Sequence, residues 1–303
     1  MQHYDALVIG GGPAGLSAGL WLARLRRQVR ILDSGRPRND PTWAVHGYPG
    51  VTDPAPHELR RVLIQQASAA GADWQACDVV SIMGEKNVFT LSLADHQALS
   101  ARRVVLAYGR RDVIPEIEGL APLYGKSVFH CPDCDGPSMV GCRLAVIGWD
   151  TQAAAIALYL LTWGRKVTLL THGQAPKLRP NALDVLAKYG VGIMSTKIAR
   201  LSSQYDRLAA VEFEDGDALP LDGLFFHIGS APASDLADNM GCRRDGDGNL
   251  EVSNAHETSV PGVYAAGDLI GPPYLAVSAA ATGVKTALAV HKSLLPQDHE
   301  LSF

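Results

Sequence analysis

The sequence predicts an α/β fold with two lobes, the second of which is inserted in the first. Two strand–helix–strand patterns recur at one constant offset without a gap, so that Val8 aligns with Val146 and Gly10 with Gly148. Alternating β-rich segments follow each pattern, and Gly and Pro residues interrupt the chain between them. Because only two copies are present, the repeat indicates two related lobes rather than a solenoid.

Each repeat has the residue pattern of a strand, a helix and a second strand. In the first repeat an apolar run precedes a glycine-rich turn, and the closing strand ends at Asp33. In the second repeat the turn begins at Gly148. Strands buried on both faces of a parallel sheet are continuous apolar runs, which is the pattern of these segments. The expected strands are 5–10, 29–32, 144–147 and 167–170, and the expected helices are 16–25 and 156–161.

The β-rich segments after each repeat alternate between apolar and polar residues. A period of two between turn residues favours half-buried antiparallel strands. We therefore expect a small antiparallel layer beside each parallel sheet, which gives two Rossmann-like lobes of the three-layer ββα type. The alternating segments are 88–93, 104–109, 208–213 and 224–229.

Two breaks in the pattern mark the expected passages between the lobes. They lie at 110–115 and 229–232, where Gly and Pro interrupt the strands. The tail beyond Pro296 is short and polar. The predicted first lobe comprises residues 1–112 and 232–303, and the predicted inserted lobe comprises residues 113–231.

Composition and charge exclude several classes of protein. The chain has 303 residues, of which 47% are hydrophobic and 19% charged, and this composition is typical of a globular protein with a sizeable core. The formal net charge of −4 argues against general nucleic-acid binding, which needs a basic face. No apolar run is long enough to span a membrane. No basic segment followed by an apolar one precedes the first strand, so we expect a cytoplasmic protein.

The first turn has the spacing of a dinucleotide-binding loop, Gly10-x-Gly12-x-x-Gly15, between a strand and a helix. The first glycine permits the tight turn, the second lets the backbone approach a pyrophosphate, and the third lets helix and strand pack closely. Amide groups at the helix N-terminus receive the phosphates. Asp33, at the end of the second strand, can accept hydrogen bonds from ribose hydroxyls.

FAD and NAD both fit this loop, so the choice between them depends on a second motif. Residues 263–268, Val-Tyr-Ala-Ala-Gly-Asp, resemble the second FAD motif of the two-dinucleotide flavoprotein disulfide reductases, in which the aspartate contacts the ribityl or phosphate region. On their own these residues would indicate only a strand that ends in a Gly-Asp turn. Together with the N-terminal loop they indicate FAD.

A cysteine pair, Cys131 and Cys134, is spaced C-x-x-C, which suits either a disulfide or metal ligands. Structural zinc needs two further Cys or His ligands at suitable spacing, and no second such pair occurs, so we expect no metal. A redox dithiol needs a readily formed thiolate, and His130 or the local turn dipole could lower the thiol pKa. Asp135 could transfer a proton to the thiolate that is released when a mixed disulfide forms.

Five motifs together resemble the low-molecular-weight thioredoxin reductase family over essentially the whole chain. A cysteine pair inside the second lobe is specific to that family, because larger disulfide reductases carry theirs near the N-terminus. The resemblance implies a homodimeric flavoprotein disulfide oxidoreductase with FAD in lobe one, in which lobe rotation presents the dithiol to its substrate. The motifs are Gly10–Gly15, Tyr48–Gly50, Cys131-x-x-Cys134-Asp135-Gly136, Gly229-x-x-Pro232 and Ala266–Asp268.

The same resemblance implies the roles of the site residues. Cys134 faces the flavin, Cys131 attacks the disulfide of the partner, and Asp135 has the acid–base role; His130 completes the predicted catalytic set. The expected cofactor-binding residues are Gly10, Gly12, Pro13, Ala14, Gly15, Asp33, Ser34, Arg38, Asn39, His46, Gly109, Gly267, Asp268, Leu275 and Ala276.

The second loop departs from the family pattern. The family binds NADPH there through G-x-G-x-x-A and a later arginine pair, whereas this loop contains Trp149 and Asp150. A carboxylate in place of the second glycine adds repulsion and bulk where a pyrophosphate must approach. Residues 171–173, Thr-His-Gly, stand where the arginines are expected, and nothing in the spacing of Lys177 and Arg179 shows that they replace them. We therefore expect a donor other than NADPH, and an NADPH-dependent enzyme with an atypical site stays an alternative.

Other relatives lack working pyridine-nucleotide motifs. Ferredoxin-dependent flavin thioredoxin reductases take electrons from an iron–sulfur protein, and the related diflavin-linked disulfide oxidoreductases carry a second flavin. Dithiol oxidases of the gliotoxin and holomycin type form disulfides in small molecules and pass the electrons to oxygen. The phrase His130-Cys131-Pro132-x-Cys134 and the segment 36–39 resemble the oxidases, which often have His where this chain has Asp135.

The sequence therefore predicts an FAD-dependent disulfide/dithiol oxidoreductase that takes electrons from ferredoxin or another donor and acts on a thioredoxin-like protein or a small disulfide. The alternatives are a small-molecule dithiol oxidase and a non-catalytic flavin sensor that uses lobe two for a partner, and the intact C-x-x-C-D disfavours the sensor. Trp149 could stack on a second flavin or another nucleotide, whereas Tyr159 is expected to be a core or interface aromatic.

Overall fold

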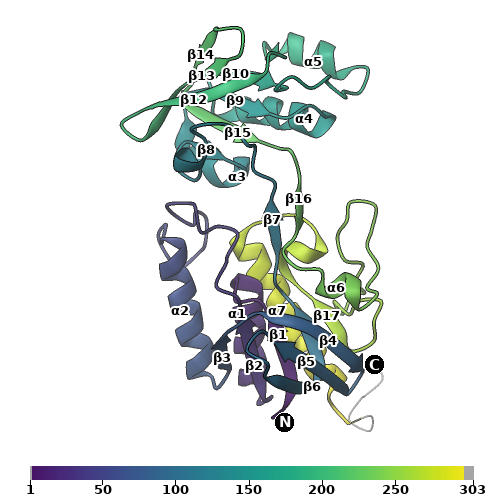
Figure 1. Ribbon diagram of the computed structural model, residues 1–303. Coiled ribbons are helices and arrows are strands. Elements are labelled where there is room, and N and C mark those ends of the chain that lie inside the picture. Colours follow the sequence, from purple (N-terminus) through teal and green to yellow (C-terminus); the bar gives the residue numbers. More distant parts are fainter. Residues whose placement is uncertain (1, 297–303) are drawn as a thin grey trace. The chain divides into compact units, whose positions relative to one another are not determined.

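The computed structural model describes residues 2–296, which fall into two compact units (Figure 1). The polar tail expected after Pro296 lies outside the described residues. Unit 1 comprises Met1–Asp40, Gly47–Arg111 and Pro232–Phe303, and unit 2 comprises Pro41–His46 and Asp112–Ala231.

The segment Pro41–His46 groups with unit 2, although the sequence places it in the first lobe. Its backbone packs against Gly125 so closely that a Cβ on Gly125 would overlap the Pro41 carbonyl oxygen. Gly125 also has a φ of +79°, a conformation that favours glycine. A close approach between residues so far apart in the chain leaves no periodic pattern in the sequence.

Unit 1 is built on one mixed sheet, whose strands are β1 (His3–Ile9), β2 (Val29–Asp33), β3 (Asp73–Ala76), β4 (Val79–Glu85), β5 (Val88–Leu93), β6 (Ala98–Leu106) and β17 (Val263–Ala265). Their order is β3-β2-β1-β6-β5-β4, and β17 also pairs with β6. β1 pairs in parallel with β2 and with β6. The last four residues of β1 are all buried, as expected for a parallel strand with both faces covered.

β6 belongs to two parts of this sheet. Its first residues pair antiparallel with β5, and its last residues pair in parallel with β1 and β17. We expected 104–109 in the antiparallel layer, and the structure corrects this, because Val104, Val105 and Leu106 are fully buried between parallel strands. Three apolar residues in a row are typical of a strand buried on both faces, whereas a half-buried strand alternates between apolar and polar residues.

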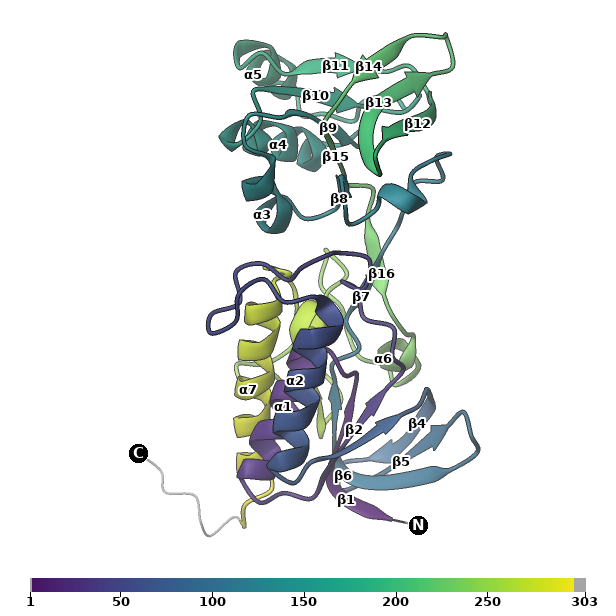
Figure 2. The ribbon, with the colours of Figure 1, turned by 90° about the vertical axis from the view of Figure 1, so that its left-hand side faces the viewer.

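Three helices cover one face of this sheet, as Figures 1 and 2 show: α1 (Pro13–Arg24), α2 (Pro56–Ala69) and α7 (Ala276–Ser293). α1 and α7 pack closely because Gly283 faces Ala14, so that a Cβ on Gly283 would overlap the Ala14 carbonyl oxygen. A Cβ on Gly267 would lie 2.9 Å from the Ala14 Cβ. These contacts join the N-terminal and C-terminal segments of unit 1. Two short helices complete the unit, α6 (Leu236–Asn239) and η4 (Gly267–Ile270).

The parallel sheet of unit 2 contains β8 (Val128–Phe129), β9 (Arg143–Ile147), β10 (Lys166–Leu170), β11 (Gly192–Met194) and β15 (Gly223–Phe226). Its order is β11-β10-β9-β15-β8, and every pairing is parallel. The expectation that 224–229 is an antiparallel segment is wrong, because β15 lies inside this sheet. The residues of β15 are buried without alternation, which explains its position.

A separate antiparallel sheet consists of β12 (Ile198–Gln204), β13 (Arg207–Phe213) and β14 (Ala218–Pro220). Figure 2 shows this sheet on one side of the parallel strands and the helices on the other, which gives three layers. Apolar residues fill both interfaces: Val211 and Phe213 pack with Ile147, and Ala153 packs with Val146. The helices are α3 (Pro132–Asp135), α4 (Thr151–Tyr159) and α5 (Ala182–Lys188), with short turns η1 (Ala121–Leu123), η2 (Gly136–Met139) and η3 (Leu160–Thr162).

The chain passes from unit 1 to unit 2 through β7 (Arg110–Asp112) and returns through β16 (Ser230–Pro232). The two strands pair as a two-stranded sheet where the sequence predicts only interruptions. Among residues 2–296, no helix is long and apolar enough to cross a membrane.

We expect Gly283→Ala to lower the free energy of unfolding by about 2 kcal/mol, because the new methyl group meets backbone that cannot move aside. Gly246→Ala is the matched control, since nothing lies within 4 Å of a Cβ there. Denaturant unfolding of both variants measures the difference. Equal stabilities would contradict the close packing of α7 on α1.

Candidate active site

The turn between β1 and α1 is built from glycines at a helix N-terminus. Gly10 has a φ of +114°, and a Cβ on Gly15 would overlap the Gly10 carbonyl oxygen. Gly12 is the N-cap residue of α1, no side chain caps this helix, and nothing lies within 4 Å of a Cβ at Gly12. The first amide groups of α1 therefore lack a side-chain acceptor, and Gly12 leaves room for a ligand. A pyrophosphate fits both conditions.

Asp33 ends β2 beside this turn and is only 5% exposed. Its Oδ1 accepts a hydrogen bond from the Gly35 amide at 3.0 Å, and its Oδ2 forms an ion pair with Arg60 of α2. A Cβ on Gly11 would overlap the Asp33 carboxylate, so this acid lies directly against the loop. Arg60 was not predicted as a site residue, because it lies within a helix and belongs to no motif.

The C-terminal motif brings two predicted cofactor residues together. The carboxylate of Asp268 forms an ion pair with Arg38 at 2.8 Å, and both side chains are largely buried. Arg38 also lies over the ring of Tyr274, 5.1 Å from its centre. Gly267 has a φ of +71°, and its amide donates to Thr282 Oγ1 at 2.9 Å, which fixes the turn that carries Asp268.

The remaining predicted cofactor residues lie at turns and helix starts, with one exception. His46 groups with unit 2. In unit 1, Pro13 and Ala14 begin α1, Ser34 and Asn39 follow β2, Gly109 has a φ of +69°, and Leu275 and Ala276 form the uncapped start of α7.

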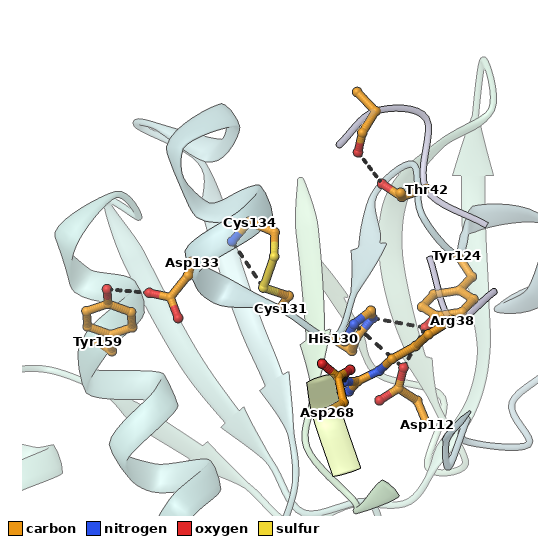
Figure 3. Close-up of a disulfide and its surroundings, with 11 residues drawn as sticks. Arg38, Thr42, Asp112, Tyr124, His130, Cys131, Asp133, Cys134, Tyr159 and Asp268 are labelled. Carbon is orange, nitrogen blue, oxygen red and sulfur yellow. Dashed lines mark hydrogen bonds and ion pairs between the residues drawn. A yellow bond between two sulfur atoms is a disulfide. The ribbon is translucent and has the colours of Figure 1, made fainter. Parts of the chain in front are cut away.

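Cys131 and Cys134 form a disulfide whose Cα atoms are 5.3 Å apart (Figure 3). Cys131 is the N-cap residue of α3, and its Sγ accepts a hydrogen bond from the Cys134 amide at 3.1 Å. An amide donor at this sulfur would stabilise a negative charge on Cys131 in the reduced pair. Both cysteines are half-buried. The other three cysteines, Cys77, Cys142 and Cys242, are free.

Asp135 follows Cys134 directly and is 6% exposed. Burial raises the pKa of its carboxyl to about 6, while the charge of His46 acts in the opposite direction. A carboxyl with this pKa is present in both protonation states near neutral pH, so it can accept and return a proton. The burial of Asp135 gives its predicted acid–base role a physical basis.

The ring nitrogens of His130 have partners other than the cysteines. Nδ1 forms a hydrogen bond with Tyr124 Oη at 3.0 Å, and Nε2 lies 3.6 Å from the Asp112 carboxylate. Figure 3 shows the imidazole directed toward these two residues, on the side away from the disulfide. Tyr124 and Asp112 were not predicted as site residues, because they lie outside every motif.

Two aromatic residues of unit 2, Tyr159 and Trp163, contact α3 and the residue that follows it. The Tyr159 hydroxyl donates to Asp133 at 2.7 Å, and the Tyr159 side chain is exposed (Figure 3). A Cβ on Gly136 would lie 2.5 Å from the ring of Trp163, which itself meets Tyr159 edge-on. Tyr159 is therefore a link between α4 and α3 rather than a buried core residue.

The turn between β9 and α4 repeats the nucleotide loop, but the chain itself caps the helix. Asp150 is the N-cap residue of α4, and its Oδ1 accepts a hydrogen bond from the Ala153 amide at 2.8 Å. The corresponding residue of unit 1 is Gly12, which provides no cap. The Asp150 carboxylate thus satisfies an amide group that a bound phosphate would otherwise use.

A second segment of unit 2 pairs with this turn. The Lys177 amide donates to the Trp149 carbonyl oxygen, and the Arg179 amide donates to Thr151 Oγ1 at 3.0 Å. The main chain at 177–179 is therefore bound to both sides of the Asp150 cap. Trp149 is half-buried, and the Lys177 and Arg179 residues are exposed. These backbone contacts have no signal in the sequence.

No group of three or more His, Cys, Asp or Glu residues within the described part of the chain is placed to hold a metal ion.

Comparisons with known proteins identify the family. A profile of the pyridine nucleotide-disulphide oxidoreductase family matches residues 4–283. Thioredoxin reductase tcpT of Claviceps purpurea (strain 20.1) is 33% identical over 279 residues, with 87% of this chain and 86% of that protein covered. Thioredoxin reductase of Bacillus subtilis (strain 168) is 27% identical over 277 residues, with coverages of 88% and 86%. The crystal structure of HlmI superposes with a TM-score of 0.90 at 35% identity and covers 96% of this chain and 92% of HlmI.

The chain belongs to the pyridine nucleotide-disulphide oxidoreductase family. Within this family it is a thioredoxin reductase-like flavoprotein that acts on sulfur groups, and membership implies FAD as the cofactor. The predicted α/β fold with Rossmann-like lobes is confirmed. Membership of the ferredoxin-dependent subgroup stays a prediction.

We expect Asp150→Ala to lower the free energy of unfolding by about 1 kcal/mol, because α4 loses its N-cap acceptor. Asp150→Asn should cost less, since its amide oxygen can still accept. Gln152→Ala, on the exposed side of the same helix, is the control. Denaturant unfolding provides the measurement, and an unchanged midpoint for Asp150→Ala would argue against the cap.

The stability of Asp135→Asn relative to the native protein should depend on pH. The folded pKa of about 6 lies above the ordinary value of 3.8, so the stabilisation by the protonated carboxyl is complete below about pH 4 and is lost as pH rises through 6. A neutral amide loses nothing over this range. The variant should therefore gain up to about 3 kcal/mol on the native protein between pH 4 and pH 7. Urea unfolding at several pH values tests this, and a constant difference would exclude a raised pKa.

Proposed function

We propose that this protein is a disulfide/dithiol oxidoreductase in which Cys131 and Cys134 exchange electrons with FAD, and that NADPH is not its electron donor. The observation that carries the first part is the disulfide at the start of α3 beside the buried Asp135. The cap by Asp150 supports the second part.

The glycine turn of unit 1 is the proposed FAD site. The amide groups of α1 would bind the pyrophosphate, Asp33 the ribose, and Asp268 the ribityl or phosphate region, with Arg38 balancing its charge. Bound FAD supplies a store of two electrons for the cysteine pair. The proposed domain roles follow from this: unit 1 holds the flavin, and unit 2 carries the dithiol.

The cysteines would act in sequence on a thioredoxin-like protein or a small disulfide. The Cys131 thiolate, stabilised by the Cys134 amide, attacks the substrate disulfide; a mixed disulfide forms and one substrate thiolate leaves. Cys134 then attacks Cys131 Sγ, which restores the Cys131–Cys134 bond and releases the second substrate thiolate. Two electrons pass to the substrate, and Asp135 accepts the proton of the Cys134 thiol.

Hydrogen bonds within the chain at the loop of unit 2 support a donor other than NADPH. Asp150 occupies the helix amide, and the backbone of 177–179 pairs with the turn. Reduced ferredoxin is the donor that we propose in place of NADPH. The half-buried Trp149 is where a second flavin or nucleotide would stack. A flavin-to-protein ratio near one after denaturation would count against a second flavin.

A small-molecule dithiol oxidase is the second candidate, and the closed loop of unit 2 favours it. A dithiol that reduces the Cys131–Cys134 disulfide delivers its electrons without any nucleotide site. In that direction the dithiol becomes a disulfide, and oxygen takes up two electrons and two protons to give hydrogen peroxide. Oxygen consumption with dithiols, in proportion to disulfide formed, would identify this direction.

Trapping of a mixed disulfide tests the proposed chemistry. Cys134→Ser holoenzyme should form a stable mixed disulfide through Cys131 with oxidised thioredoxin or a small disulfide, because the resolving thiol is absent. Cys131→Ser should trap no partner, and both variants should lose turnover. Cys142→Ser, which removes a free cysteine, should behave as the native enzyme. Intact mass spectrometry detects the adducts, and full turnover by Cys131→Ser would overturn the proposal.

A further inference from the structure

His130 precedes the reactive cysteine and is held at both ring nitrogens. Tyr124 Oη lies 3.0 Å from Nδ1, and Asp112 Oδ2 lies 3.6 Å from Nε2. Tyr124 Oη is also 3.5 Å from Asp112 Oδ2, so the three side chains contact one another in pairs. The Asp112 side chain is only 7% exposed, which limits competition from water.

The three residues come from different elements of unit 2. Asp112 ends β7, the strand by which the chain enters the unit, and Tyr124 follows η1. His130 follows β8, the edge strand of the parallel sheet. The ring of Phe226, from β15, packs against Tyr124 and His130 with centres 5.5 and 6.4 Å away. The cluster therefore joins the entry strand to the sheet at a point one residue from Cys131.

Cys131, which carries the reactive sulfur, follows His130 directly in the chain. Cys131 has a φ of −114° and a ψ of 103°, and this extended conformation places its Sγ 3.1 Å from the Cys134 amide. Among residues 2–296, the Cys131 side chain makes no other hydrogen bond. The fixed neighbour on its N-terminal side is His130.

We propose that Tyr124, His130 and Asp112 form a positioning cluster that holds Cys131 in reach of the Cys134 amide. The inference rests on the proposed role of Cys131 as the attacking thiolate. His130 acts through the backbone of Cys131, as an anchor, and not as a positive charge beside the sulfur. Asp112 contacts the second ring nitrogen, so the imidazole is held from both sides.

The anchor role predicts a loss of reactivity when either partner of His130 is changed. Asp112→Asn loosens the imidazole at Nε2, so Cys131 should become less reactive. Tyr124→Phe removes a hydrogen bond without changing charge, so it should have an effect only if His130 is an anchor.

The experiment measures the rate of Cys131 alkylation by iodoacetamide in prereduced holoenzyme, with peptide mass spectrometry to separate Cys131 from Cys134. We expect Tyr124→Phe, Asp112→Asn and His130→Asn each to lower this rate roughly fivefold, the scale of one lost hydrogen bond. In the His130→Asn background, Tyr124→Phe should have no further effect, because both act through one side chain. Tyr205→Phe, at an exposed tyrosine, is the control and should match the native rate.

Three results would overturn the inference: a faster rate for Asp112→Asn, independent effects of Tyr124→Phe in both backgrounds, or no change in any variant. Hydrogen exchange should show faster exchange in Tyr124→Phe only for peptides covering 128–136, and faster exchange throughout unit 2 would indicate general unfolding instead. Alkylation requires no turnover. Failure of the proposed function, seen as full turnover by Cys131→Ser, is therefore distinguishable from failure of the positioning cluster.

Discussion

A helix leaves its first amide groups without partners in its own turns, and the group that accepts their hydrogen bonds differs between the two units of this chain. In unit 1 that position is Gly12, which offers no acceptor and leaves space for a pyrophosphate. In unit 2 the repeat has Asp150, whose carboxylate accepts from the Ala153 amide. The two loops of the repeat thus differ at one equivalent position, which is an uncapped glycine in unit 1 and a capping aspartate in unit 2.

The amide groups at the start of α3, beside the cysteine pair, also need a hydrogen-bond acceptor. The Sγ of Cys131 accepts a hydrogen bond from the Cys134 amide, so a sulfur of the redox pair provides the acceptor at the start of α3. Asp135, one residue beyond the pair, is buried enough to hold or release a proton near neutral pH. The cysteine pair thus has an amide donor at one sulfur and a buried carboxyl beside it, within one short helix. These two features support the thiol exchange that we propose for unit 2.

The sequence predicted the elements whose signal is local. Adjacent residues alone predict the turn with glycines at 10, 12 and 15, the C-x-x-C pair and the apolar strands. The structure contains each of these features. The sequence could not predict contacts between distant side chains or backbones: the pairing of Arg60 with Asp33, the anchoring of His130 by Asp112, or the packing of Pro41 on Gly125. The sequence also predicted antiparallel layers for β15 and for the last residues of β6. Both pair in parallel, and a short apolar run does not show which strand will be its neighbour.

Anaerobic reduction of the bound flavin tests the closed loop of unit 2 most directly. The holoprotein is mixed in separate stopped-flow runs with NADPH, NADH, reduced ferredoxin and dithiothreitol, and the loss of the long-wavelength flavin absorbance is followed. The proposed function predicts that reduced ferredoxin or the dithiol bleaches the flavin within the time of one turnover, and the Asp150 cap predicts that neither nicotinamide does. Bleaching by NADPH at the rate of turnover would contradict this account.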